Sequence, residues 1–194
     1  MRETMNDQND RYFEYLKGRT RLGAWYGAHV LYPKLARRLS GRTLDIGCGI
    51  GDMLSFRPGT VGVDINPRIV AHCRSIGLEA HLMEGDRLPF DADSFDSVLM
   101  DTVLEHVAQA QPMPQEAGRV LVPGGRLLVG VPGQRGWDSD PDRKVYYDEQ
   151  SLPATVQPQG FRLAEAFYAP LFKSPWLARR MRQYCMYALF TRSQ

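Results

Sequence analysis

The stretch LDIGCGIGD, from Leu44 to Asp52, decides the fold. It begins in a short apolar segment over residues 42–46 with the pattern of a strand, and it runs through three glycines into a helix predicted over residues 49–56. Because glycine lacks a Cβ, it permits a tight turn in which the backbone approaches a ligand closely. The helix that follows has unpaired N–H groups in its first turn. The stretch therefore predicts a strand–turn–helix unit with a ligand over the turn.

A second acidic residue follows at the spacing of a nucleoside site. Asp64 ends the next predicted strand, TVGVD, 19 residues after Asp45, and an acid at this position hydrogen-bonds the two ribose hydroxyls of an adenosine. Asp45 and Asp52 flank the glycines, where they would repel a pyrophosphate and attract a ligand that carries an ammonium and a sulfonium. This favours S-adenosylmethionine over a nicotinamide dinucleotide. A tight turn without a ligand is the third interpretation.

The rest of the chain alternates between strand and helix patterns. Strands are predicted over residues 42–46, 60–64, 79–83, 95–100 and 126–132, and helices over 67–76 and 103–121, the latter interrupted by two prolines. Such alternation predicts a parallel, doubly wound α/β sheet that binds ligands at the carboxyl ends of its strands. Later strand patterns over 160–168 and 183–191 bring the total to seven and predict an antiparallel pair at the end. Residues 8–39 have the spacing of helices, and 134–147 of a polar loop before a helix over 148–156.

Length and composition describe one globular domain. The chain has 194 residues, of which 43% are hydrophobic and 24% charged, so it is long enough for one sizeable core. The formal net charge of +2 does not call for a nucleic-acid partner. The three cysteines do not have metal-ligand spacing, so the sequence predicts no metal site. No stretch has the pattern of a signal peptide or a membrane span, which together with the unpaired cysteines predicts a cytoplasmic protein.

Four blocks in this order resemble the class I S-adenosylmethionine-dependent methyltransferases of the methyltransferase type 11 group. They are LDIGCGIGD, VGVDINP, GDRLPFDADSFDSVLMDTVLEHV and RVLVPGGRLLVGVP, which together run from Leu44 to Pro132. The resemblance implies a Rossmann-like sheet of strand order 3-2-1-4-5-7-6, the last strand antiparallel. It also implies one domain over residues 1–194, with a helical lid (1–40), a cofactor-binding core (41–133) and an acceptor-side part (134–194).

The resemblance also implies which residues hold the cofactor. Asp45, Gly47, Cys48 and Gly49 would line its methionine part, Asp64 would take the ribose hydroxyls and Ile65 would pack on the adenine. Gly85, Asp86 and Arg87 would lie at the adenine edge, and Asp101 and Thr102 beneath the cofactor. In related enzymes an N-terminal segment closes over the cofactor, so we expect Tyr15 or Arg21 to approach it if this segment is a lid.

The acceptor side is less defined by the pattern. Methyl transfer depends mainly on positioning, although a hydroxyl acceptor also needs a general base, for which His106 and Asp101 are the candidates. Substrate-binding candidates are Arg143, Lys144, Tyr146 and Tyr147. Arg143 stands where relatives often carry a histidine, which weakens the case for a histidine base and could favour an anionic acceptor.

We therefore expect methyl transfer from S-adenosylmethionine, giving S-adenosylhomocysteine, to a hydroxyl of a small molecule or a sugar on a cell-surface glycan or lipid-linked intermediate. The basic C-terminal segment over residues 170–190 has the pattern of a last helix and strand, and peripheral membrane contact is its alternative function. Two other functions stay open: a non-catalytic protein that binds S-adenosylmethionine as a regulator or scaffold, and an NAD-dependent oxidoreductase.

Overall fold

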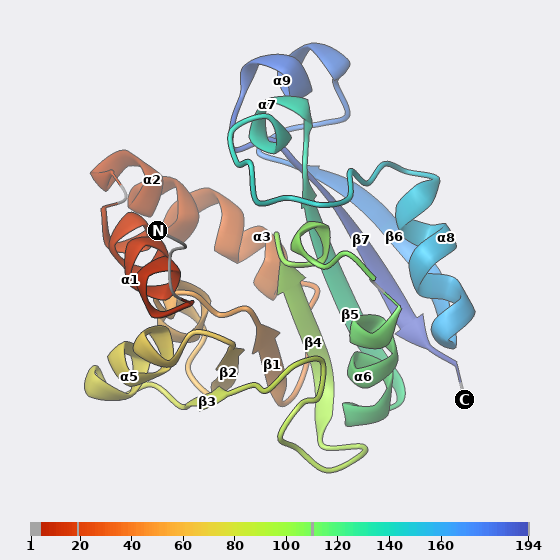
Figure 1. Ribbon diagram of the computed structural model, residues 1–194. Helices are drawn as coiled ribbons and strands as arrows, with labels where there is room; N and C mark the ends of the chain where they lie inside the picture. Colours follow the sequence, from red (N-terminus) through yellow and green to blue (C-terminus); the bar gives the residue numbers. More distant parts are fainter. Residues whose placement is uncertain (1–4, 19, 110, 194) are drawn as a thin grey trace.

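The computed structural model describes residues 5–18, 20–109 and 111–193, which surround one mixed sheet of order β3-β2-β1-β4-β5-β7-β6 (Figure 1). Its strands are β1 (Thr43–Ile46), β2 (Thr60–Asp64), β3 (Ala80–Leu82), β4 (Phe95–Asp101), β5 (Leu121–Pro132), β6 (Phe161–Ala169) and β7 (Cys185–Arg192). The first five pair in parallel, and β7 runs antiparallel to both β5 and β6. The predicted strand order is confirmed.

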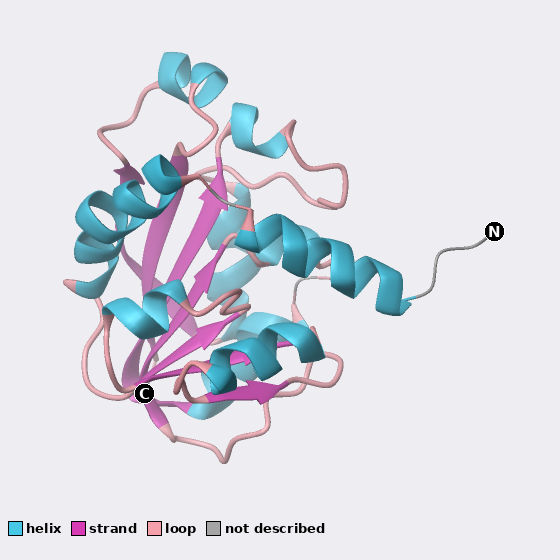
Figure 2. Cartoon of the chain, turned by 90° about the vertical axis from the view of Figure 1, so that its left-hand side faces the viewer, coloured by secondary structure: helices cyan, strands magenta, loops and turns pink. Residues whose placement is uncertain are grey.

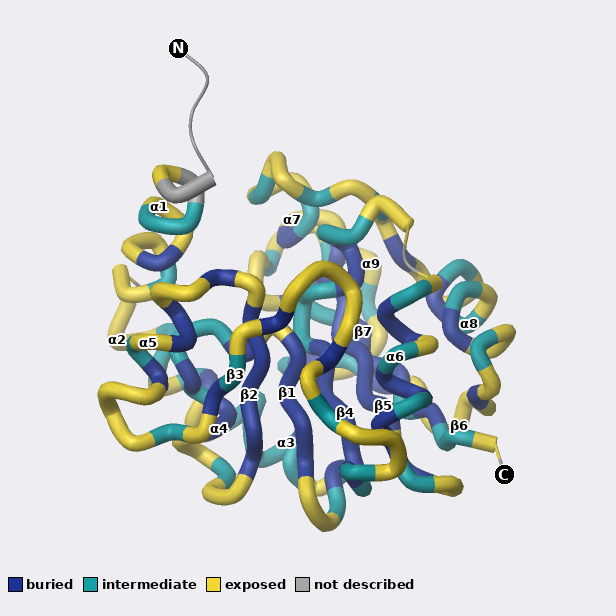
Figure 3. The backbone as a smooth tube through the Cα atoms, turned by 60° about the horizontal axis from the view of Figure 1, so that its bottom comes forward, coloured by how far each residue is buried: buried dark blue, intermediate teal, exposed yellow. Residues whose placement is uncertain are grey.

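Helices cover both faces of the sheet (Figure 2). They are α1 (Met5–Lys17), α2 (Arg21–Tyr26), η1 (Gly27–Leu31), α3 (Tyr32–Ala36), α4 (Asp52–Phe56), α5 (Pro67–Ser75), η2 (Leu104–His106), α6 (Pro112–Val120), α7 (Gln134–Trp137), α8 (Ser151–Val156), η3 (Gln157–Gln159) and α9 (Pro175–Arg180). The central strands β1, β2 and β4 are buried along most of their length (Figure 3), whereas the edge strand β6 is largely exposed. Strands buried on both faces need continuous apolar runs, which is what TLDI and TVGVD supply around their single acids.

Alternation along the strands divides the core between the two faces. Leu127 and Val129 of β5 pack in one cluster with the buried residues of α6 and α8. Leu128, between them, packs in a second cluster with Leu35 of α3 and Met53 of α4. This period of two follows from the strand geometry, in which successive side chains point to opposite faces.

One predicted helix was placed wrongly. The pattern predicted a helix from Val103 that Pro112 and Pro114 would interrupt, but residues Leu104–His106 form one 3-10 turn and α6 begins at Pro112; Ala110 lies outside the described residues. A proline at the first position costs no hydrogen bond, since that N–H has no partner in a helix anyway. Pro112 therefore starts a helix instead of breaking one, and His106 stands in a short turn directly after β4.

The N-terminal segment is helical, as predicted, and it is divided into several short helices. Gly18 ends α1, whereas Gly23 lies inside α2, where its N–H donates to Thr20 Oγ1 at 3.1 Å. The polar stretch predicted as a loop over residues 134–147 contains the short helix α7. Residues 1–4 and Arg19 of the predicted lid lie outside the described residues. Among the described helices, each is too short or too polar to cross a bilayer.

Candidate active site

The glycine turn after β1 has the close-approach geometry that the sequence predicted. Gly47, Gly49 and Gly51 have φ values of +71°, +51° and +82°, a region that side chains with a Cβ rarely adopt. A Cβ on Gly47 would lie 2.5 Å from Val103 Cγ2. The N–H of Gly47 also donates to Val63 O at 2.8 Å, which ties the turn to the end of β2.

Two buried carboxylates lie at this turn. Asp64 accepts the N–H of Gly49 at 3.2 Å on Oδ2 and the N–H of Asn66 at 2.9 Å on Oδ1. Burial raises the pKa of Asp64, and these backbone hydrogen bonds act against that rise. Burial, together with the negative charges of Asp101 and Asp64, raises the pKa of Asp45 well above its usual range. A cation bound beside Asp45 would relieve this cost.

One cavity of about 750 Å³ extends from the glycine turn across the carboxyl ends of β1 and β4. The predicted site residues that line it are Asp45, Gly47, Cys48, Gly49, Asp101, Thr102, His106 and Arg143. Its volume suits a small-molecule site. Buried acids of raised pKa and a turn without Cβ atoms fit the ammonium and sulfonium of S-adenosylmethionine, so the residues present fit this cofactor.

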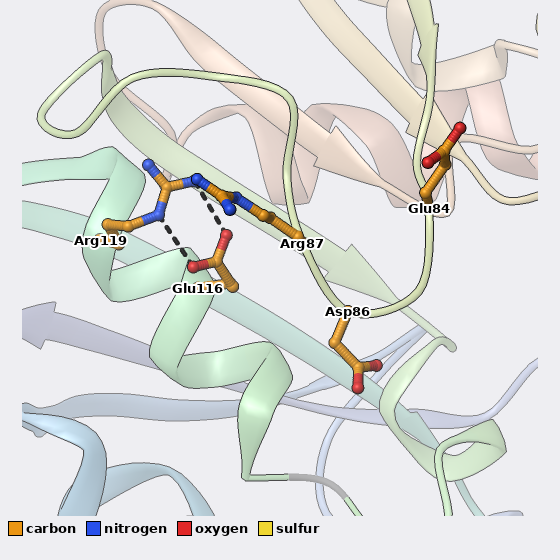
Figure 4. A pocket seen from close by; sticks show the side chains of 5 residues that line it. All are labelled: Glu84, Asp86, Arg87, Glu116 and Arg119. Carbon is orange, nitrogen blue, oxygen red and sulfur yellow. Dashed lines mark hydrogen bonds and ion pairs between the residues drawn. The ribbon is translucent and has the colours of Figure 1, made fainter.

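The residues predicted at the adenine edge lie apart from this cavity. Asp86 and Arg87 line a separate recess of about 390 Å³ with Glu84, Glu116 and Arg119 (Figure 4). In that recess Arg119 is already bound, because its Nε lies 2.8 Å from Glu116 Oε1. Neither Gly85 nor Ile65, which is 64% exposed, is among the lining residues of the large cavity.

A row of three residues crosses β4, β5 and β7 at the cavity floor, which the two outer residues, Asp101 and Tyr187, line. Asp101 pairs with Gly130, which pairs with Tyr187. Tyr187 Oη donates to Asp101 Oδ1 at 2.8 Å across the position that Gly130 leaves empty. Burial raises the pKa of Asp101 to about 6, and the Tyr187 hydrogen bond limits that rise. Thr102, next to Asp101, has φ +58°, a strained value for a β-branched residue.

Next to this floor, His106 faces the loop after α7. Its Nε2 lies 3.9 Å from Asp140 Oδ2, and burial lowers its pKa. The neighbouring Glu105 is fully buried, and its carboxylate lies 3.4 Å from Arg143 Nε. Burial raises the pKa of Glu105 to about 7. Arg143 also donates to Gly136 O, so its guanidinium holds the loop against η2.

The other three predicted substrate residues lie outside the cavity lining. Lys144 is exposed. Tyr146 packs edge-on against Trp137, with ring centroids 5.5 Å apart. Tyr147 is buried in the core with α8. Of the four candidates, the structure thus brings only Arg143 to the cavity.

The N-terminal helix α1 packs over the glycine-turn side of the cavity. Its Tyr12, Tyr15 and Leu16 line the cavity, whereas Arg21 does not. Three contacts join α1 to both halves of the domain: Asp10 Oδ1 lies 2.7 Å from Arg68 Nη1, Asn9 O accepts Asn66 Nδ2 at 2.8 Å, and Arg182 donates to Tyr15 Oη. Burial, followed by the charge of Asp64, raises the pKa of Tyr12 to about 12.

Several residues that line the cavity lie far in sequence from the glycine turn, and the motif of that turn does not predict them. Tyr26 comes from α2, Asp140 from the loop after α7, Arg182 from the segment before β7, and Tyr187 from β7 itself. A partial signal was present for Tyr187, because Gly130 interrupts an apolar strand, and such a glycine often marks the close approach of another group.

Comparison with known proteins agrees with this geometry. Residues 44–129 match the family model of the methyltransferase domain. A probable S-adenosylmethionine-dependent methyltransferase of Mycolicibacterium smegmatis is 34% identical over 118 residues, which are 57% of this chain and 46% of that protein. The human probable tRNA methyltransferase 9B is 37% identical over 92 residues, 45% of this chain and 20% of that protein. The chain spans less than half the length of these curated relatives.

A solved structure has the same fold over nearly the whole chain. A candidate methyltransferase from Haloferax volcanii, solved in complex with the Trm112 methyltransferase activator, has a TM-score of 0.78 and 19% identity, with 98% of each chain covered. At this identity the likeness concerns the fold, whereas the family rests on the matched sequence of residues 44–129. Residues 44–129 therefore match the methyltransferase domain of class I S-adenosylmethionine-dependent enzymes, and S-adenosylmethionine is the cofactor that this match implies.

Proposed function

We propose that the protein transfers a methyl group to a hydroxyl of a small molecule or a sugar in the cytoplasm. The observation that carries this proposal is the continuity of one cavity from Gly47 and Gly49 to Asp101 and His106. S-adenosylmethionine supplies an activated methyl group on a sulfonium there. Asp45 and Asp64, with the backbone of the glycine turn, bind the cofactor, and the acceptor lies in the half lined by Asp101 and His106.

Two side chains in that half can take the acceptor's proton. The pKa of Asp101, about 6, leaves it ionised at neutral pH, and the lowered pKa of His106 leaves its imidazole neutral. We favour Asp101, because the hydrogen bond from Tyr187 fixes its orientation at the cavity floor. Arg143 faces Glu105 and Gly136 O, so we propose that it positions the loop and does not bind an anionic acceptor.

Calorimetric titration with S-adenosylmethionine, S-adenosylhomocysteine and NAD tests the cofactor assignment. We expect the first two ligands to bind the wild type and to lose most of their affinity in Asp64→Ala. Asp91→Ala is the matched control, since Asp91 is exposed, lines neither cavity and should leave the affinity nearly unchanged. Binding of NAD alone, or no nucleoside binding, would refute the proposal. Binding without turnover on any acceptor would support the regulator or scaffold instead.

RNA is the second candidate acceptor. The expectation that the chain has no nucleic-acid partner is not supported, because one relative is named a probable tRNA methyltransferase and one structural neighbour was solved with an activator subunit. Incubation of bulk tRNA with radiolabelled S-adenosylmethionine, with and without a Trm112-type protein, tests this candidate. If tRNA is labelled only when the Trm112-type protein is present, the two proteins together form an RNA methyltransferase.

A further inference from the structure

The segment over residues 170–183, which we call the tip, connects β6 to β7 and exposes large apolar side chains. Leu171, Phe172 and Trp176 are 55%, 69% and 62% exposed. Figure 1 shows α9, in the middle of the tip, at the end of the molecule toward which β4 points. Three exposed bulky apolar side chains within six consecutive positions are a local concentration of the kind that often marks an interaction site.

The tip is a built structure that holds these side chains outward. Tyr184 is buried, accepts the N–H of Ser174 at 2.7 Å and donates to Phe172 O at 3.2 Å through the same hydroxyl. Leu177 is buried on the inner side of α9. The N–H of Gly133 donates to Tyr184 O at 2.8 Å, which ties the tip to the end of β5. The exposure of Phe172 therefore follows from an ordered backbone.

The tip is also basic. Its charged residues are Lys173, Arg179, Arg180 and Arg182, and it contains no acid. Lys173 is paired with Glu149, and Arg182 donates to Tyr15, so their charges are partly used inside the protein. Arg179 and Arg180 are exposed, and the Arg180 guanidinium lies 5.2 Å from the centre of the Trp176 ring.

The tip borders the cavity that holds the candidate site. Arg182 and Gln183 line that cavity. On another side of the cavity α2 contributes Gly23 and Tyr26 to the lining, and it exposes Leu22 (73%) and Trp25 (55%). Exposed apolar side chains thus belong to two of the elements that form the cavity wall.

From this arrangement we propose that the tip docks the protein on the surface of a bilayer that contains anionic lipids. Tryptophan, phenylalanine and leucine enter the boundary between headgroups and acyl chains, while arginine beside them binds lipid phosphate. The strand β7 is excluded from this contact because Met186, Tyr187 and Ala188 are buried in the sheet. Docking through residues 170–183 brings the cavity to headgroup level, where an acceptor with an apolar anchor is presented.

The same patch suits RNA or a second copy of the chain less well. RNA affinity depends on cations that contact phosphates, and half of the tip's cations already have partners. Leu171 and Phe172 also offer apolar bulk that has no role in reading phosphates. A second copy would gain from the apolar residues but would bring Arg179 and Arg180 close to like charges.

Co-sedimentation of the full chain with vesicles tests this proposal. The vesicles are phosphatidylcholine alone, and phosphatidylcholine with about a third of phosphatidylglycerol. We expect the wild type to sediment with the anionic vesicles. Arg179→Gln/Arg180→Gln should lose about fivefold in affinity for each arginine, and Phe172→Ser/Trp176→Ser roughly tenfold or more. Ile76→Ser is the matched apolar control, 52% exposed at the end of α5, and should bind like the wild type.

Circular dichroism and cofactor affinity confirm that each variant is folded, so a lost interaction belongs to the tip. The proposal is overturned if the wild type stays in solution with anionic vesicles, or if both double variants bind them unchanged. It is equally overturned if gel filtration shows a dimer that Phe172→Ser/Trp176→Ser abolishes, and neither the wild type nor any variant binds vesicles. Fluorescence anisotropy that gives tRNA binding lost in the arginine variant, without vesicle binding, would assign the tip to RNA.

Discussion

Gly130→Ala should destabilise this protein, although alanine normally stabilises a strand relative to glycine. A Cβ on Gly130 would lie 2.3 Å from Tyr187 Cε1 and 2.7 Å from Asp101 Oδ1, far inside van der Waals contact. The Tyr187 ring cannot simply swing away, because it is fully buried and stacked on Phe167 at 5.2 Å between centroids. The row Asp101–Gly130–Tyr187 therefore has no room for one methyl group.

The cost follows from two contributions. Overpacking of a well-packed core costs about 1–3 kcal/mol. Loss of a hydrogen bond to a charged group, here from Tyr187 to Asp101, adds about 1.5–3 kcal/mol. Because the two losses share one cause, we expect a decrease in the free energy of unfolding of roughly 2–5 kcal/mol, or a Tm lower by about 4–20 °C for a chain of this size. Thermal and chemical denaturation measure it directly.

A second background identifies the clash itself. Tyr187→Leu removes the ring atoms that the new Cβ would meet, so Gly130→Ala should cost less than half as much in that background as in the wild type. A coupling of this kind between adjacent residues is what a double-mutant cycle reports. If Gly130→Ala stays within about 0.5 kcal/mol of the wild type, the ordinary range for a harmless substitution, the reasoning about the row is wrong.

Three further predictions follow from the same site. Burial raises the pKa of Asp101 from 3.8 to about 6, so the wild type loses stability as pH rises between these two values. Asp101→Asn carries no such charge. In chemical denaturation it should therefore be more stable than the wild type by up to about 3 kcal/mol at pH 7, and by little at pH 4. Gly47→Ala, at φ +71° and 2.5 Å from Val103 Cγ2, should cost about 1–3 kcal/mol in a thermal melt and weaken cofactor binding in calorimetry; unchanged values for both would contradict the strained-turn account. Asp10→Asn should leave the Tm nearly unchanged, because the ion pair with Arg68 is half-exposed and screened by solvent. A clear loss in a thermal melt would mean that α1 depends on that pair.

The cofactor half of the site was open to prediction because its signals are local. Gly47 and Gly49 lie within five residues of Asp45, and the conformation they permit is a property of the backbone at those positions. Asp64 lies one strand further on, and parallel pairing brings the end of β2 beside the end of β1. The sheet order came from the resemblance of four blocks, and the structure confirms it.

The acceptor half was only partly predictable because its residues meet through register across the sheet. Asp101 and Tyr187 are 86 positions apart, and they touch because β5 and β7 place Gly130 between them. Nothing near Tyr187 in the sequence indicates this partner. Tyr146 and Tyr147 follow Arg143 closely in sequence, but one packs on Trp137 and the other enters the core.

The glycine turn and the opposite wall of the cavity should differ in how well they tolerate substitution. Substitutions in the glycine turn act on a strained backbone, so most of them should reduce folding and cofactor binding together. Residues such as Tyr26 and Arg182 reach the cavity from α2 and from the tip, elements that pack outside the parallel core. Their replacement alters the acceptor wall with little change to the turn. Tyr187 is the exception, since it belongs both to the cavity floor and to the buried sheet, and a change there should affect stability and acceptor binding at once.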